Sequence, residues 1–157
     1  MVEFADGPVP DHMMGEVWPA AEPGEDPVLY GHAEIDPKGP VQVRSLQTFR
    51  LVYTAGRYGL DDTGSIRVAL RVFSDGGALQ IHDPAADNYV TAHTSSGVPL
   101  VVRYDNRGSA RPRFKSLTVH VRGGYLREGD TITITFGDTS GGSRGLRMQT
   151  MVEADFQ

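Results

Sequence analysis

Strict alternation of apolar and polar residues between positions 131 and 136 constrains this chain more than any other feature. Ile132, Ile134 and Phe136 fall on one face of an extended segment, and the threonines between them fall on the other. A period of two is that of a strand with one buried face and one face in water. Glycine-rich turns bound the segment on both sides, so the rest of the chain is expected to cover its apolar face.

Several other segments show the same alternation or a similar bias toward β-branched and aromatic residues. They are 29–35, 46–53, 65–73, 89–94, 99–104, 117–122 and 147–156. The chain also holds 19 glycines and 10 prolines, which favour short strands and tight turns over long helices. We therefore predict an all-β fold, a single antiparallel β-sandwich of about seven to nine strands, either immunoglobulin-like or jelly-roll-like.

The N-terminal part differs in composition from the rest. Residues 1–28 are rich in proline, glycine, alanine and acids and show no regular period, so we predict an extended or disordered acidic arm there and the sandwich domain at 29–157. The first 36 residues hold nine of the 20 acids and no Lys or Arg. This asymmetry indicates either a solvated leader or an arm that docks on a mildly basic body. Trp18 is a candidate anchor for such docking or for a partner, with a loosely packed aromatic as the alternative.

Composition excludes several classes of protein. The chain has no cysteine, which rules out disulfides, a thiol nucleophile and thiolate metal sites, and which fits a reducing compartment. The N-terminus lacks the basic and apolar regions of a signal peptide, and no apolar run approaches the roughly 20 residues of a membrane span. We therefore expect a cytoplasmic protein with no membrane partner.

Polar residues in the predicted loops form the first candidate site. They are Asp61, Asp62, Gln80, His82, Asp83, Asn88, Asp138 and Arg144. Carboxylate and amide oxygens suit a small polar ligand or a hard cation. The same residue types also form ordinary turns, and their spacing is not that of a dense calcium loop. We expect no metal and no cofactor, and we keep ligand binding and turn formation as alternatives.

Basic residues between positions 103 and 127 form the second candidate site. Arg107, Arg111 and Arg113 lie at its centre and suit carboxylate, phosphate or sulfate groups on a partner. Nucleic acid is not expected, because the sequence pI is about 5.4 and few aromatics lie among these residues. Docking of an acidic segment or another subunit, and a solvated loop, remain the alternatives.

The sequence contains no recognisable catalytic motif. It has no nucleophile elbow, no zinc-binding HExxH helix and no phosphate-binding loop that leads into a helix. The five histidines are scattered along the chain, so no Ser/His/Asp arrangement can be assigned. We assign no catalytic residue and favour a chain without enzymatic activity of its own, with a metal-dependent hydrolase kept as the third and least favoured alternative.

A set of ordered motifs carries a family resemblance over about residues 31–157. The motifs are LVYTAG at 51–56, GLDDTG at 59–64, Gln80 with DP at 83–84 and NYV at 88–90, LREGD at 126–130, FGD at 136–138 and GSRGLRMQT at 142–150. The chain resembles the N-terminal β-rich region of a large family of bacterial proteins of unknown function. In longer members that region precedes a domain similar to PHP-type metal-dependent phosphoesterases. The resemblance implies that the metal ligands belong to the following domain, so none is assigned here.

Together these observations lead to two functional hypotheses. The first is a non-catalytic accessory module that acts through protein–protein contacts or self-association, as a subunit or leading domain beside a metallohydrolase-type catalytic chain. The alternative is a module that binds a carbohydrate or another small polar or anionic molecule through the polar loops. For carbohydrate, the candidate aromatic platforms are Tyr58, Tyr89 and Tyr125.

Overall fold

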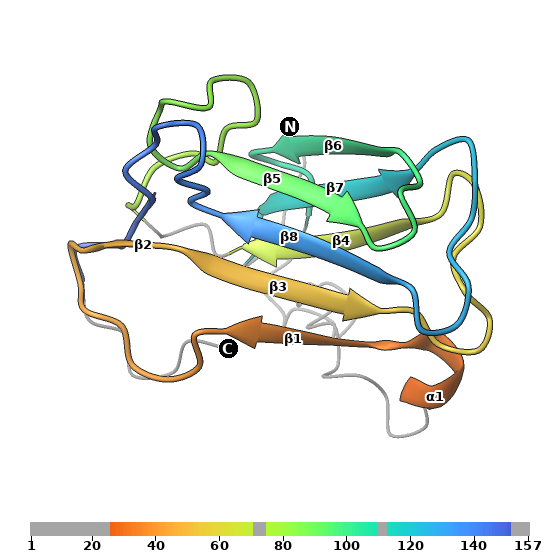
Figure 1. Ribbon diagram of the computed structural model, residues 1–157. Helices are drawn as coiled ribbons and strands as arrows, with labels where there is room; N and C mark the ends of the chain where they lie inside the picture. Colours follow the sequence, from red (N-terminus) through yellow and green to blue (C-terminus); the bar gives the residue numbers. More distant parts are fainter. Residues whose placement is uncertain (1–25, 71–74, 110–112, 152–157) are drawn as a thin grey trace, which may run out of the picture.

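The computed structural model describes residues 26–70, 75–109 and 113–151. The elements are α1 (Pro27–Tyr30), β1 (His32–Asp36), β2 (Leu46–Gln47), β3 (Phe49–Thr54), β4 (Ser65–Leu70), β5 (Val90–Thr94), β6 (Leu100–Asp105), β7 (Lys115–Val121), β8 (Thr131–Phe136) and β9 (Leu146–Arg147). A four-stranded sheet in the order β1-β3-β8-β5 faces a three-stranded sheet in the order β4-β7-β6, and β2 pairs with β9 at one end (Figure 1). All named pairs are antiparallel, which confirms the predicted all-β sandwich.

The strand order distinguishes between the two predicted kinds of sandwich. In an immunoglobulin constant domain the last strand joins the sheet opposite the first two strands. Here the last strand of the two main sheets, β8, lies in the same sheet as β1 and β3, between β3 and β5. Strands β3, β4, β5 and β6 alternate between the two sheets. This interlaced order favours the jelly-roll-like alternative.

The core lies between the central strands of the two sheets, β7 and β8. Ile132 and Ile134 on β8 and Leu117, Val119 and Val121 on β7 are fully buried. The alternation seen in the sequence therefore predicts the buried faces of both strands correctly.

The other face of β8 is less open than the alternation indicates. Thr133 is only 4% exposed, although it lies on the outer face of the sheet. It lies between Val52 on β3 and His93 on β5, which are its cross-strand neighbours on that face.

The first described element is a helical turn where the sequence predicts the start of a strand. The Asp26 side chain accepts a hydrogen bond from the Val28 N–H (2.9 Å), Pro27 occupies the first turn, and Gly31 ends the helix with φ +95°. A Cβ at Gly31 would lie 2.2 Å from the Thr54 carbonyl oxygen, so only glycine fits there. The domain boundary expected between residues 28 and 29 falls within this turn, and the arm to residue 25 lies outside the described residues.

Two other predicted strands differ from the structure. The predicted strand at 46–53 is interrupted at Thr48, which separates β2 from β3. Of the predicted last strand at 147–156, the described residues 148–151 are not in a strand, β9 spans Leu146–Arg147, and residues 152–156 lie outside the described residues.

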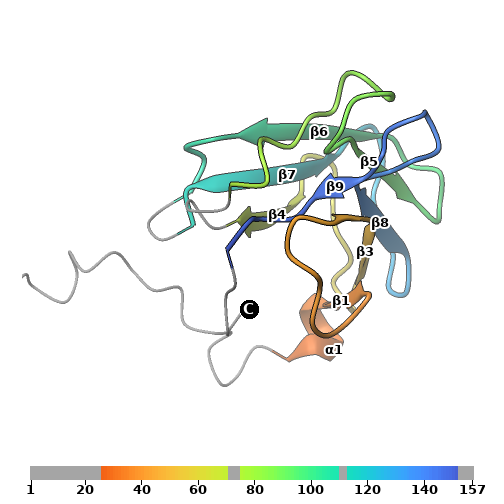
Figure 2. The ribbon, with the colours of Figure 1, turned by 90° about the vertical axis from the view of Figure 1, so that its left-hand side faces the viewer.

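Strand β1 forms one edge of the larger sheet and extends beyond the smaller one. All five of its residues are exposed, and Ile35 keeps 42% of its surface accessible. Figure 2 shows that β1 lies beyond β4, so no described strand of the three-stranded sheet covers it. Within the described ranges, no helix has the length and apolar character needed to cross a membrane.

Candidate functional site

The predicted ligand-binding residues divide between the two ends of the sandwich. Asp61 and Asp62 lie in the β3–β4 connection, where the Asp62 carboxylate accepts a hydrogen bond from the Gly123 N–H (2.9 Å). Gln80, His82, Asp83 and Asn88 lie in the β4–β5 connection, and Asp138 and Arg144 lie between β8 and β9. The latter two connections touch, because the Ser143 N–H donates to the Pro84 carbonyl (3.0 Å). The structure therefore brings six of the eight predicted residues to one end.

Gln80 and Asp83 hold the β4–β5 connection together from within. The Gln80 amide nitrogen donates to the carbonyls of Asp83 (2.6 Å) and Ala86 (3.3 Å), and its oxygen accepts from the N–H groups of His82 and Asp83. The Asp83 carboxylate accepts from the Ala85 N–H (3.0 Å), as in an Asx turn. The Gln80 amide is therefore used within the loop, whereas the exposed Asp83 carboxylate spends one acceptor position on the turn.

Asn88 is buried and joins three segments. Its side-chain nitrogen donates to the carbonyls of Gly76 (3.0 Å) and Ala78 (3.2 Å), and its oxygen accepts from the Arg147 N–H (2.7 Å). Its φ is +63°, a conformation that asparagine tolerates better than most residues. Asn88 is therefore a structural residue rather than an exposed ligand-binding group.

Asp138 and Arg144 also have partners within the protein. The Thr91 hydroxyl donates to the Asp138 carboxylate (2.6 Å) and the Ser140 N–H donates to its other oxygen (2.9 Å), and these bonds lower the pKa of Asp138. Arg144 makes a bidentate contact with Asp87 (2.9 and 2.5 Å), which lowers the pKa of that carboxylate. The Arg144 side chain is 72% exposed, so the pair contributes little to stability.

The hydrogen bond from Thr91 gives a pH-dependent prediction. Because the pKa of Asp138 is lowered in the fold, its contribution to stability is present above the unfolded value of about 3.9 and is lost as pH falls through the folded value. Thr91→Val should raise the pKa of Asp138 and lower the free energy of unfolding by about 1 kcal/mol at neutral pH. NMR titration and urea unfolding would measure both effects. Thr135→Val, the neighbouring threonine on β8, should leave the titration unchanged, and an equal shift in both variants would contradict the assignment.

The predicted partner-binding arginines are only partly described. Arg107 and Arg113 are exposed in the β6–β7 connection, whereas Trp18 and Arg111 lie outside the described residues. Arg122 and Arg127 follow β7 and so lie at the opposite end of the sandwich. Arg107 and Arg113 therefore lie apart from Arg122 and Arg127, at the other end of the sandwich.

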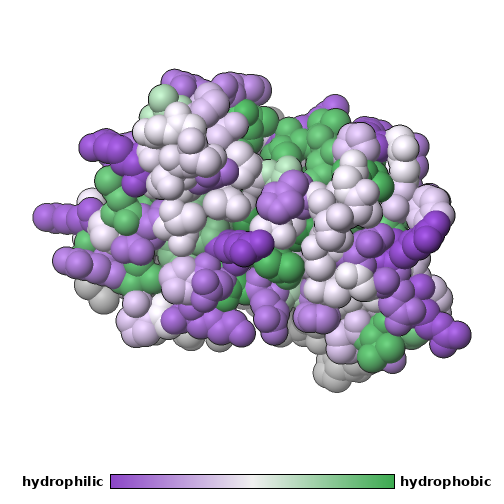
Figure 3. Space-filling model, in the orientation of Figure 1, coloured by the Kyte–Doolittle hydropathy of each residue, from purple (hydrophilic) through white to green (hydrophobic). Residues whose placement is uncertain are grey.

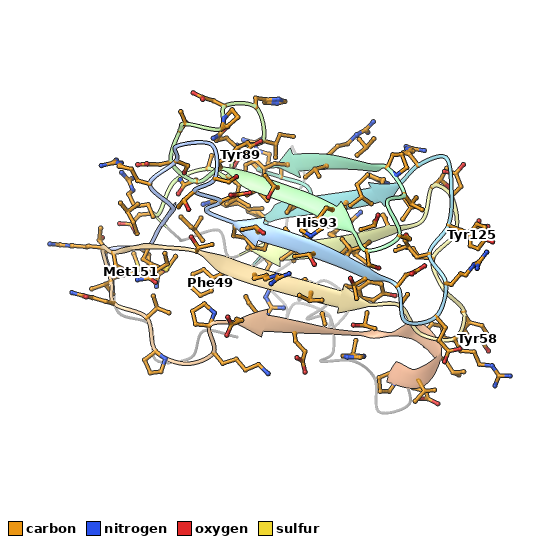
Figure 4. All side chains as sticks on the ribbon, in the orientation of Figure 1. Phe49, Tyr58, Tyr89, His93, Tyr125 and Met151 are labelled. Carbon is orange, nitrogen blue, oxygen red and sulfur yellow. The ribbon has the colours of Figure 1, made fainter. Side chains whose placement is uncertain are left out.

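Aromatic residues gather at the end of the sandwich away from the polar loops. Tyr58 and Tyr125 lie at this end and Tyr89 at the other (Figure 4). The rings of Tyr30 and Tyr58 meet edge to face at 5.5 Å, and the Arg127 guanidinium lies 5.5 Å from the Tyr125 ring centre. An open cavity of about 330 Å³ adjoins Tyr125 and Arg127, and its other lining residues are Ser96, Val98, Gly124 and Asp130.

The outer face of the four-stranded sheet shows no concentrated charge or apolar patch. Hydrophilic and intermediate side chains predominate on it, with smaller apolar areas between them (Figure 3). His93 lies on this face beside β8 (Figure 4). Among the described residues, no three His, Asp or Glu side chains are grouped so as to hold a metal ion.

The free edge of β1 is the site that sequence analysis did not single out. The Ala55 N–H donates to the carbonyl of Asp130, just before β8 (2.9 Å), so the backbone groups of Ala55 point toward β8. Because successive residues of a strand point their backbone groups to opposite sides, the N–H and C=O of Val52 point toward β1, where Val52 pairs with Glu34. The backbone groups of Ala33 and Ile35 therefore point away from the sheet, and no partner for them lies among the described residues. The sequence signal was the short segment at 29–35, which reads as an edge-like strand.

Comparison with known proteins adds no relationship: no protein-family model, curated protein or solved structure matches this chain.

Proposed function

We propose that this chain is a non-catalytic accessory module that acts by binding another protein through the edge of the larger sheet. The observation that carries the proposal is the exposure of β1 on both faces together with the outward backbone groups of Ala33 and Ile35. An edge strand of this kind is a ready surface for pairing with another chain. Ile35 adds apolar area beside it.

The resemblance described above supports a more specific form of the proposal. The module would serve as a subunit or leading domain beside a metallohydrolase-type catalytic chain, which would supply the metal ligands. A cytoplasmic location belongs to the same proposal, since a chain without cysteine fits a reducing compartment.

The ligand-binding alternative has weaker support. Gln80, Asn88 and Asp138 use their polar atoms in hydrogen bonds within the protein, and Arg144 is paired with Asp87. A ligand at this end would have to compete with those bonds. The tyrosines and the open cavity at the opposite end offer apolar contact, but the predicted ligand residues at that end are limited to Asp61 and Asp62.

The proposal is tested by purifying the chain from its source cells and identifying the proteins that purify with it. The wild type is compared with two variants, each of which changes one exposed apolar residue. Ile35→Arg places a charge beside the β1 edge, whereas Val101→Arg changes a residue of similar exposure (38%) on β6. We expect a stoichiometric protein partner to be recovered with the wild type and with Val101→Arg, and at least tenfold less of it with Ile35→Arg. Light scattering and mass spectrometry of the same chromatographic peak would measure this.

Two results would contradict the proposal. One is recovery of the chain alone as a monomer. The other is equal recovery of the partner with both variants, which would place the interaction away from β1.

A further inference from the structure

We infer that the partner adds a strand to the edge of β1, and that this strand alternates apolar residues with basic ones. This inference rests on the proposed function and specifies the chemistry of the partner. It follows from the direction of the backbone groups, the side chains on each face of β1 and the limits at each end of the strand.

Ala33 and Ile35 supply the hydrogen bonds for an added strand. Each presents one N–H donor and one C=O acceptor away from β3, which is the pattern that an antiparallel or parallel neighbour uses. Pro37 follows β1 and has no N–H, and the Gly31 N–H already donates to the Pro27 carbonyl (2.9 Å). The edge therefore accepts a short extended segment centred near Glu34.

The two faces of β1 differ in chemistry. On the inner face Ala33 and Ile35 are apolar and uncovered by any described strand, so an added strand gains by placing apolar residues there. On the outer face Asp36 lies opposite Arg50 of β3, but Glu34 lies opposite Val52. Glu34 therefore has no cation opposite it within the sheet, and a Lys or Arg of the partner would complete the cross-strand pair.

A second copy of the chain fits this edge poorly. Symmetric antiparallel pairing centred on Glu34 would place the two Glu34 carboxylates opposite each other, which is unfavourable. Centring on Ile35 would set Glu34 against Asp36 and Ala33 against Pro37, and centring on Ala33 would require the occupied N–H of Gly31. A different chain with basic residues is the better match.

The other described sheet edges are less available. On β5 the Val90 N–H already donates to the Gln80 carbonyl (2.9 Å), and Val90 and Thr94 at its two ends are buried. Strands β4 and β6 alternate between exposed and half-buried residues, so one face of each lies against the opposite sheet. Among these edges, β1 alone is exposed at every described position.

The test uses the full chain and two short synthetic peptides, one in which valine alternates with lysine and one in which valine alternates with glutamate. Amide hydrogen exchange measured by NMR is the readout. We expect the lysine peptide to slow exchange at Ala33 and Ile35 by roughly tenfold or more, because these amides become hydrogen-bonded. The glutamate peptide should leave both amides unprotected.

Variants of the edge separate strand pairing from general electrostatic attraction. Ala33→Pro removes an outward N–H while sparing the bonds to β3, so it should weaken binding of the lysine peptide about fivefold relative to Ala33→Val, which keeps the N–H. Glu34→Lys should reverse the preference between the two peptides: the affinity for the lysine peptide should fall about fivefold and that for the glutamate peptide should rise about fivefold.

Three outcomes would overturn the inference. They are equal binding by the proline and valine variants, equal protection by both peptides, and protection without peptide that rises with chain concentration, which would identify a second copy. If the peptides fail while Ile35→Arg abolishes capture of the natural partner, strand addition is wrong and the proposed function stands.

Discussion

Replacing Ile134 with alanine is expected to lower the free energy of unfolding by about 3 kcal/mol. The side chain is fully buried at the centre of β8, so the substitution loses transfer free energy and leaves a cavity between the sheets. Urea unfolding at neutral pH, monitored by circular dichroism, would measure the loss.

A matched isoleucine on the surface provides the control. Ile35→Ala removes the same atoms from a side chain that is 42% exposed, and it should cost less than about 1 kcal/mol. Similar losses for the two variants would contradict the assignment of Ile134 to the centre of the core.

Asn88→Ala is expected to lower the free energy of unfolding by about 2–3 kcal/mol. The substitution removes the partner of the buried Gly76 carbonyl and of two part-buried groups, the Ala78 carbonyl and the Arg147 N–H. It also places alanine at a φ of +63°. Chemical unfolding of the two proteins under the same conditions would measure the difference.

Asp83→Ala is the control for this result. Both residues are predicted from the sequence as ligand-binding groups, but Asp83 is exposed and makes a local turn bond to the Ala85 N–H. Its loss should cost less than about 1 kcal/mol. A small effect at both positions would indicate that Asn88 does not hold the loops together.

The fold could be predicted from the sequence where one face of a strand is fully buried. The alternation of Leu117, Val119 and Val121, and of Ile132 and Ile134, identifies the two central strands because both pack against the opposite sheet. Alternation alone does not reveal which strands are neighbours, so the strand order was left open between two kinds of sandwich. The pairing of β8 with both β3 and β5 depends on contacts between distant segments.

The helical turn α1 was missed although its signals are present in the sequence. Asp26 at the N-cap, Pro27 in the first turn and Gly31 just after the last are a typical set of helix boundaries. The apolar residues Val28 and Leu29 favoured a strand instead. The turn is held by tertiary contacts, because the Val28 and Leu29 carbonyls accept hydrogen bonds from the Arg57 and Tyr58 N–H groups.

The candidate site could be predicted only in part. The sequence identified polar residues that do come together, such as Gln80, Asp83 and Arg144, but residue type cannot show that their hydrogen bonds are made within the protein. The edge at Ala33 and Ile35 was not identified as a site, because exposure on both faces of β1 results from the larger width of one sheet.

Hydrogen–deuterium exchange on the full chain, free and in complex with its co-purified partner, tests the role of the β1 edge most directly. If the partner binds this edge, it protects the backbone amides of β1, with the largest change at Ala33 and Ile35. Protection confined to the polar loops at 80–88 and 138–144, with β1 unchanged, would contradict that role and would return the site to the residues that the sequence first indicated.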